Sequence, residues 1–252
     1  MSAPPASPIL YDRIGQQYSA TRQADPRIAA AISAALAGAE SIVNVGAGAG
    51  AYEPDGRHVV AVEPSWKMIQ QRPPRAAPVI QSPAEALPFR TGAFAAALAV
   101  LTVHHWGDWR RGLAEMKRVA QRLVILTIDP GEVGRFWLTA TYFPEIAAVD
   151  RGRCPPVAEL VAYLGNCRVD PVLIPHDCID GFLAAFWRRP EAYLDPAIRA
   201  GMSGFALLAP DVIDRGLAQL KSDLASGEWE RRCGHLRSLE ALDASYRLLV
   251  VN

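Results

Sequence analysis

The sequence has no excess of charge of either sign, because 26 lysine and arginine residues stand against 26 aspartate and glutamate residues. A protein that attracts nucleic acid or an anionic membrane through its overall field needs a positive excess. The composition therefore predicts no nucleic-acid partner. Half of the 252 residues are hydrophobic, so the chain is expected to bury a large core.

Closely spaced cysteines and long hydrophobic runs are also missing. The four cysteines form no CxxC pair, which predicts a reduced, cytoplasmic protein without a structural metal site. The N-terminal MSAPPASPIL lacks the basic region and apolar stretch of a signal peptide. The longest apolar run, FAAALAVLTV at 94–103, has about half of the roughly twenty residues that a membrane-spanning helix needs. No membrane span is expected.

Short hydrophobic runs in the first half of the chain predict strands. Their hydrophobicity is continuous rather than alternating, which is typical of strands covered on both faces of a parallel sheet. Asp25 and Pro26 suit the start of a helix that extends to residue 37, and WRRGLAEMKRVAQ has the hydrophobic stripe of a crossover helix. Strands alternating with helices indicate an α/β, doubly wound domain. The runs are 41–45, 58–63, 78–81, 94–100 and 122–128.

Beyond residue 130 the alternation loosens. VAELVAYLG predicts a short helix, CRVDPVLIP predicts a sixth strand, and YRLLVV predicts a last strand. A helical insertion at about 176–240, which includes a helix at about 211–225, separates these two strands. It is either a substrate lid or a second helical layer that only packs. The sequence has no internal repeat, so residues 1–252 are predicted to form a single domain.

A glycine-rich turn follows the first predicted strand, in SIVNVGAGAGAYEP. Glycines at such a turn let the backbone approach a ligand closely. Gly46, Gly48 and Ala51 satisfy the GxGxxG/A pattern of dinucleotide-binding proteins, whereas Gly46, Gly48 and Gly50 satisfy the GxGxG turn of proteins that bind S-adenosylmethionine. A tight structural turn is the third interpretation, and the turn alone does not decide among them.

Glu63 ends the second predicted strand, 17 residues after Gly46. A carboxylate at this position accepts hydrogen bonds from the ribose hydroxyls of an adenosine. Because both cofactor classes contain adenosine, Glu63 supports either of them. Met68, in the helix predicted from EPSWKMIQ, is a candidate to lie against the adenine, although a methionine in the core fits the pattern nearly as well.

Two further stretches decide the interpretation. AEALPFRTGAFAAALAVLTVHHW at 84–106, together with VNVGAGAG and VVAVEPS, resembles the class I (Rossmann-like) S-adenosylmethionine-dependent methyltransferases. The similarity is greatest to the type 11 branch, which includes the ubiquinone and menaquinone C-methyltransferases, and it covers roughly residues 11–130. It implies a seven-stranded, mostly parallel sheet with helices on both faces, a last antiparallel strand, and N-terminal cap helices at about 9–24.

The resemblance also implies which residues hold the cofactor. Those at AEALPF would hold the adenine, the segment from Ala99 to His105 would lie beside the methyl group, and the leading helix would cover the methionine end. The implied set is Tyr18, Arg22, Asn44, Gly46, Gly48, Gly50, Glu63, Pro64, Met68, Ala84, Glu85, Ala99 and Leu101.

Three positions depart from the family pattern. The family has acidic residues where this chain has Asn44, Pro83 and Ala95. Asn44 accepts a hydrogen bond but cannot neutralise the ammonium group of the cofactor. Because of these departures, one alternative stays open: a protein that retains the fold and binds a ligand but does not catalyse a reaction. The other alternative is an NAD(P)-dependent oxidoreductase, which would leave AEALPF and HHW unexplained.

The implied reaction is in-line displacement of a methyl group onto a small molecule, with O-, N- and C-methylation all open. It needs alignment, exclusion of water and, for a weakly ionised acceptor, a base. His104 and His105 are the candidate bases, because an imidazole titrates near neutral pH. An aromatic-rich second half predicts a pocket for an apolar or aromatic substrate, unless these side chains only pack. The candidate pocket residues are Tyr11, Trp106, Trp137, Tyr142, His176 and Trp187.

Overall fold

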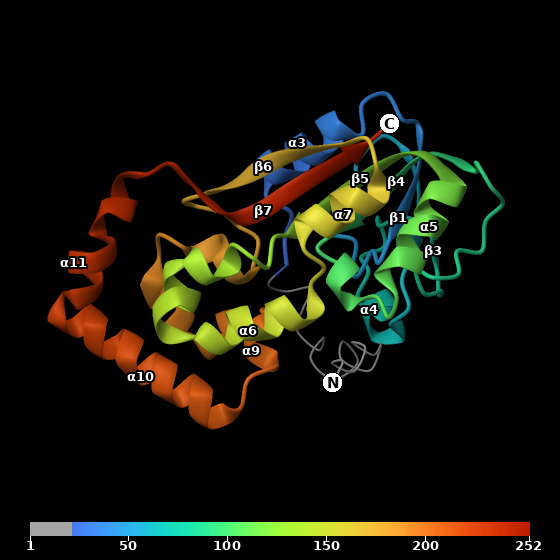
Figure 1. Ribbon diagram of the computed structural model, residues 1–252. Coiled ribbons are helices and arrows are strands. Elements are labelled where there is room, and N and C mark those ends of the chain that lie inside the picture. Colours follow the sequence, from blue (N-terminus) through green and yellow to red (C-terminus); the bar gives the residue numbers. More distant parts are fainter. Residues whose placement is uncertain (1–21) are drawn as a thin grey trace.

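A computed structural model describes residues 22–252 and contains one seven-stranded sheet in the order β3-β2-β1-β4-β5-β7-β6 (Figure 1). The first five strands pair in parallel, and β7 runs antiparallel to both of its neighbours. The predicted α/β sheet with a last antiparallel strand is therefore confirmed. The strands are β1 (Ser41–Val45), β2 (His58–Val62), β3 (Val79–Ile80), β4 (Phe94–Val100), β5 (Ala120–Ile128), β6 (Cys167–Pro175) and β7 (Ala241–Val251).

Both faces of the sheet are buried, which is why hydrophobic residues in the central strands are continuous rather than alternating. Alternate residues of one strand enter different cores: Ile42 packs with α3 (Pro26–Ala35), whereas Val43 packs with α5 (Trp109–Val119) and α7 (Val157–Leu164). The Asp25 side chain caps α3 by accepting from Arg27 N, and Pro26 occupies its first turn. Asp25 and Pro26 thus identify the start of α3 correctly. The helix ends at Ala35, two residues before its predicted end.

Most of the helices after β5 fall into two groups. One follows β5 and consists of η3 (Val133–Arg135), η4 (Leu138–Tyr142) and α6 (Pro144–Arg153). The other is the insertion between β6 and β7, which contains η5 (Leu183–Phe186), η6 (Pro190–Leu194), α8 (Pro196–Arg199), α9 (Ser203–Ala206), α10 (Pro210–Ser226), α11 (Glu228–Cys233) and η7 (Gly234–Ser238). Figure 1 shows α6, α9, α10 and α11 together as a helical lobe beside the sheet. The insertion predicted at about 176–240 is therefore helical.

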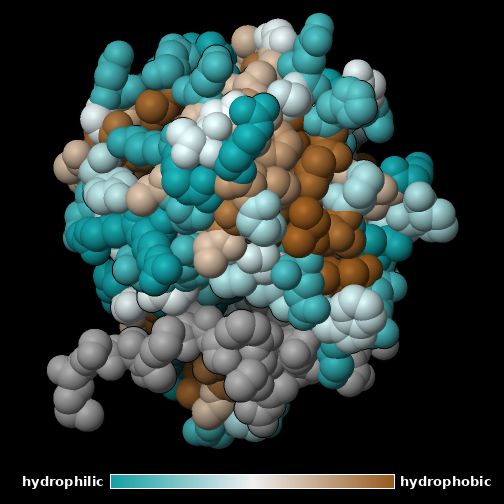
Figure 2. All heavy atoms as spheres, turned by 90° about the vertical axis from the view of Figure 1, so that its right-hand side faces the viewer, coloured by the Kyte–Doolittle hydropathy of each residue, from teal (hydrophilic) through white to brown (hydrophobic). Residues whose placement is uncertain are grey.

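The opposite side of the molecule carries β3 and α4 (Trp66–Gln70). Its surface is mostly hydrophilic with a limited hydrophobic patch (Figure 2). The edge strand β3 has only two residues, so it offers little backbone for pairing with another chain. Within residues 22–252, no helix has both the length and the hydrophobicity to cross a membrane.

Candidate active site

The glycine turn lies at the carboxyl end of β1, in the middle of the sheet. Gly46, Gly48 and Gly50 all have positive φ, at 69°, 53° and 88°. A Cβ added to Gly46 would lie 2.0 Å from Thr102 Oγ1, just after the neighbouring strand β4. Gly46 therefore serves two purposes: it adopts a left-handed backbone, and it lets the ends of β1 and β4 come into contact.

The N–H groups of this turn are used inside the protein. Those of Gly46 and Ala47 donate to Val62 O at 2.8 and 3.0 Å, and that of Gly50 donates to Ala47 O. Residues 46–57 form turns rather than a helix. A dinucleotide site directs free N–H groups and a helix N-terminus at a pyrophosphate. This turn lacks the helix N-terminus, and the N–H groups of Gly46, Ala47, Gly48 and Gly50 are already bonded within the protein, so its geometry does not support the dinucleotide alternative.

Glu63 connects the turn to the end of β2. Its carboxylate accepts from Gly48 N at 2.8 Å and from Ser65 N at 2.9 Å. Ser65 then caps α4 by accepting from Met68 N. The Met68 side chain is buried beneath the turn, with its Cε 3.3 Å from the position of a Cβ on Gly48. Glu63 and Met68 thus both lie against Gly48 of the glycine turn.

A buried ion pair that the sequence interpretation missed supports the turn from below. Arg72 donates to Gly48 O at 3.0 Å and pairs with Glu53, whose other oxygen accepts from Ala77 N. Both side chains are less than a tenth exposed. The two residues are 19 positions apart within loops, so no periodicity marks them as partners.

The other residues of the implied cofactor set are buried or make contacts within the protein. Ala84 is buried, whereas the Glu85 carboxylate accepts from Asp108 N at 2.9 Å and fixes the start of α5. Pro64 O accepts from the Gln81 side chain. Asn44 is buried near the end of β1, paired in the sheet with Ala61 and Leu98. Glu85 therefore has a structural contact that its sequence position did not indicate.

The end of β4 brings the candidate bases next to the turn. Ala99 is fully buried within the strand, Leu101 has a positive φ of 51°, and His105 N donates to Thr102 O within η2 (Val103–His105). The two imidazole rings lie 3.9 Å apart between centroids. Leu101, His104 and His105 line one cavity of about 70 Å³ between the sheet and the helical lobe.

Burial, followed by the neighbouring His105, Arg153 and Arg22 side chains, lowers the pKa of His104 well below its ordinary 6.5. Burial and the same arginines also lower the pKa of His105. Both imidazoles are therefore neutral at pH 7. A neutral imidazole accepts a hydrogen bond at one ring nitrogen and donates at the other.

This shift predicts an acid-sensitive fold. The unfolded chain protonates His104 near pH 6.5, whereas the folded protein does so only at much lower pH. As the pH falls below 6.5, His104 should therefore lower the free energy of unfolding by up to ~1.4 kcal/mol for each pH unit. Urea unfolding of wild type and His104→Gln at pH 5 to 7 measures this slope. The slope of unfolding free energy against pH should be shallower in His104→Gln than in wild type. The control His58→Gln, at an exposed position, should have the wild-type slope. A wild-type slope in His104→Gln would show that burial of His104 does not make the fold sensitive to acid.

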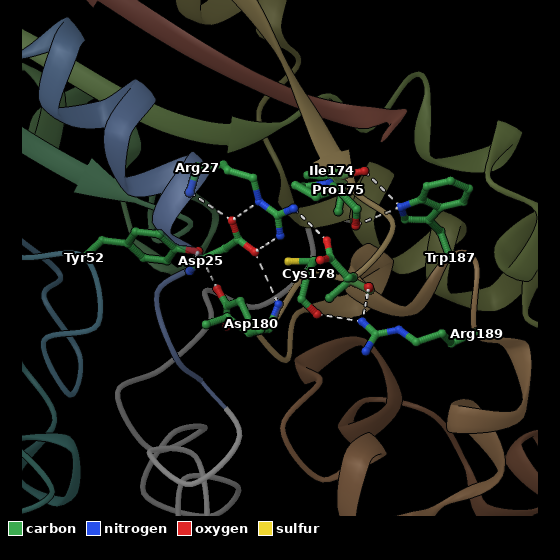
Figure 3. A network of polar contacts seen from close by, with 12 residues as sticks. Asp25, Arg27, Tyr52, Ile174, Pro175, Cys178, Asp180, Trp187 and Arg189 are labelled. Carbon is green, nitrogen blue, oxygen red and sulfur yellow. Dashed lines mark hydrogen bonds and ion pairs between the residues drawn. The ribbon is translucent and has the colours of Figure 1, made fainter. Parts of the chain in front are cut away.

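Arg22 lies where the N-terminal segment meets the insertion. Its Nε donates to Asp180 Oδ1 at 2.6 Å, and Tyr52 Oη donates to Asp180 Oδ2 at 2.8 Å. Asp25 N donates to Tyr52 Oη at 3.4 Å (Figure 3). This network joins the residues before α3, the loop after β1 and the loop after β6. Tyr11 and Tyr18 lie outside the described residues.

Most of the aromatic residues predicted to form the pocket lie elsewhere. Trp187 is fully buried and donates from Nε1 to Ile174 O, as Figure 3 shows. Trp137 donates to Trp187 O, and Tyr142 donates to Asp223 in the helical lobe. These three residues pack in the core, because the lobe needs large side chains to cover the sheet. None of them lines the 70 Å³ cavity, whose aromatic walls are Phe136, Phe182 and Tyr246.

The two other predicted pocket residues are also outside this cavity. Trp106 packs over Gly112, where an added Cβ would lie 2.4 Å from its Cε3. His176 Nε2 lies 3.3 Å from the Glu240 carboxylate, where β6 ends and β7 begins. The contact of His176 joins residues 64 positions apart, which local sequence does not relate.

Comparison with known proteins places the chain in a family. Residues 43–128 match the model of the methyltransferase domain. A crystal structure from Anabaena variabilis, named as a methyltransferase from an antibiotic biosynthesis pathway, is 35% identical over 92% of this chain and 99% of that one, with a TM-score of 0.86.

Two more distant structures share the fold alone. The YcgJ protein of Bacillus subtilis has 17% identity, covers 89% of this chain and 96% of its own, and has a TM-score of 0.52. The plantazolicin methyltransferase BpumL, solved with S-adenosylhomocysteine and a substrate analogue, has 11% identity, covers 95% and 89%, and also has a TM-score of 0.52. A search of curated proteins found no match.

The similarity over nearly the whole length of the Anabaena protein, the strand order and the matched domain agree. They favour S-adenosylmethionine over a nicotinamide cofactor, and an enzyme over a binding protein without catalysis. The chain belongs to the class I S-adenosylmethionine-dependent methyltransferases.

Proposed function

We propose that this enzyme transfers a methyl group from S-adenosylmethionine to a small molecule by in-line displacement at an oxygen, nitrogen or carbon atom. One observation carries the proposal: the glycine turn after β1 and the carboxylate at the end of β2 are joined by the Gly48 N to Glu63 hydrogen bond. Because the turn has glycines, a ligand can approach its backbone closely. The buried carboxylate supplies hydrogen-bond acceptors for a ribose.

The residues at this edge fit the cofactor. Glu63 is 6% exposed at a strand end, and a carboxylate has about four acceptor sites, so it can serve the loop and a ribose together. Met68 and Ala84 offer apolar contacts to the adenine. Asn44 and Arg22 are proposed for the amino-acid end, with Tyr18. Residues 1–252 are proposed to form one domain, in which the insertion at 176–240 covers the acceptor.

S-adenosylmethionine supplies a methyl group on a positively charged sulfur, which is already reactive. The protein therefore has to align the acceptor, keep water out and, where the acceptor carries a proton, remove it. The helical lobe covers the carboxyl ends of β4 and β5 and excludes water. His104 and His105 are proposed to accept the proton, since both are neutral and line the cavity.

Replacing Glu63 with alanine should weaken binding of S-adenosylhomocysteine by about 1 to 3 kcal/mol, or roughly 5- to 150-fold, because the ribose hydroxyls lose their acceptor. Isothermal titration calorimetry measures this affinity. Glu40→Ala is the matched control, since Glu40 is exposed before β1, at the other end of that strand. An unchanged affinity in Glu63→Ala would show that the ribose lies elsewhere.

The proposed base is tested by turnover. His104→Gln should lower transfer of labelled methyl into a metabolite extract by about 100-fold or more if its imidazole accepts the proton, while affinity for S-adenosylhomocysteine stays the same. His105→Gln tests the second imidazole in the same way. Turnover that survives both substitutions would exclude a histidine base.

A further inference from the structure

The 70 Å³ cavity is lined by charged side chains of both signs. Two arginines, Arg22 and Arg153, contribute to its lining, whereas Asp150 is the single carboxylate among the described lining residues. Asp180, which neutralises Arg22, does not line the cavity. Arg22 is therefore balanced by Asp180 from outside the cavity, and Arg153 with Asp150 is the charged pair within its described lining.

Arg153, in the last turn of α6, is only partly satisfied by its partner. Its Nε and Nη2 both contact the same oxygen of Asp150, Oδ1, at 3.0 Å. Nη2 also lies 3.4 Å from Ser203 Oγ. Nη1 is buried and has no hydrogen-bond partner in the part of the chain that the structure describes. A buried guanidinium N–H without an acceptor is costly, so an acceptor is expected there.

A second unsatisfied atom lines the same cavity. His104 is 7% exposed, and its Nδ1 is buried without a partner among residues 22–252. Phe136, Phe182 and Met202 supply apolar walls of the same cavity. A volume of 70 Å³ corresponds to roughly two water molecules, so it encloses a small group, such as a carboxylate with the atoms next to it, rather than a large natural product.

We infer that the acceptor is a small organic acid, whose carboxylate binds the Nη1 and Nη2 edge of Arg153 while its apolar body lies against Phe136 and Phe182. This inference rests on the proposed function, because it names the substrate class of that site. A carboxylate matches the planar fork of a guanidinium and forms charge-assisted hydrogen bonds to it. The end nearer His104 is then the methyl-accepting end.

Asp150 helps to separate this role from a purely structural one. Burial raises the pKa of Asp150 although Arg153 lies beside it, which shows how strongly this carboxylate is desolvated. Asp150 also competes with an incoming carboxylate for the same guanidinium. Removing the charge of Asp150 should therefore strengthen acid binding, whereas removing that of Arg153 should abolish it.

The test is calorimetry on the full chain saturated with S-adenosylhomocysteine. The probes are benzoate, 4-hydroxybenzoate, phenylacetate and hexanoate, each beside its primary amide. We expect at least one acid to bind wild type at least tenfold more tightly than its amide. Arg153→Gln should lose the preference for the acid and keep its affinity for the amide. Asp150→Asn should increase the preference for the acid. Arg151→Gln, an exposed arginine on the same helix, is the matched control and should behave as wild type.

Two results overturn the inference and leave the proposed function standing: S-adenosylhomocysteine binds but no acid does, or every acid binds no better than its amide. An acid preference that survives in Arg153→Gln also overturns it. If Arg153→Gln does not fold, the comparison of acid and amide on wild type still decides the question. Failure of wild type to bind S-adenosylhomocysteine would instead refute the proposed function, and this inference with it.

Discussion

Replacing Gly46 with alanine should abolish measurable binding of S-adenosylhomocysteine. Two costs combine at this residue. Its φ of 69° is left-handed, which costs an alanine about 1–2 kcal/mol. The new methyl group would also lie 2.0 Å from Thr102 Oγ1, and overpacking of this kind costs about 1–3 kcal/mol more.

The expected loss exceeds the strain itself, because Thr102 cannot move alone. Its carbonyl accepts from His105 N, so a displaced Thr102 also moves the turn that holds the two histidines. Calorimetry and thermal unfolding measure the two effects. Gly92→Ala is the matched control: its φ is 66°, but nothing lies within 4 Å of the added Cβ. It should lose some stability and keep the cofactor affinity, whereas normal affinity in Gly46→Ala would refute the close contact.

Replacing Asp180 with asparagine should lower the free energy of unfolding by about 3–5 kcal/mol, which is typical for breaking a buried ion pair. Asp180 is fully buried, and it accepts from both Arg22 and Tyr52. Figure 3 shows the contact with Tyr52. The amide removes the charge opposite Arg22, whose side chain is 10% exposed. Domains have only about 5–15 kcal/mol of stability in total, so the variant should be close to unfolding at 37 °C.

A control on the same loop separates burial from charge. Asp177 forms an ion pair with Arg27, and both side chains are more than half exposed. Asp177→Asn should therefore change the midpoint of urea unfolding little, since exposed ion pairs contribute little to stability. Equal midpoints for Asp180→Asn and Asp177→Asn would show that the network of Arg22, Tyr52 and Asp180 does not hold the three loops together.

The sequence was sufficient for the parts of the fold that depend on local patterns. Continuous hydrophobic runs identified the strands, and Asp25 with Pro26 identified the start of α3. Gly46 and Glu63 could be singled out as candidates because both lie at strand ends, and the structure joins the two segments through the Gly48 N to Glu63 hydrogen bond. The absence of a helix between β1 and β2 was not foreseen, and it is the feature that makes the turn unsuitable for a pyrophosphate.

The other parts of the site depend on contacts between distant residues. Tyr52 and Asp180 are 128 positions apart, and Arg153 meets Ser203 across 50. No periodicity relates such pairs. The prediction of an aromatic pocket met a related difficulty. A tryptophan that lines a pocket and one that fills a core cannot be distinguished in the sequence. Trp187 fills the core, while Phe136 and Phe182 reach the cavity.

The most direct test of the account is a crystal structure of the enzyme with S-adenosylhomocysteine. The account predicts that the ligand crosses the glycine turn after β1, with both ribose hydroxyls within hydrogen-bond distance of the Glu63 carboxylate and the sulfur on the side of His104. A ligand bound away from this turn, or a ribose that does not contact Glu63, would contradict it.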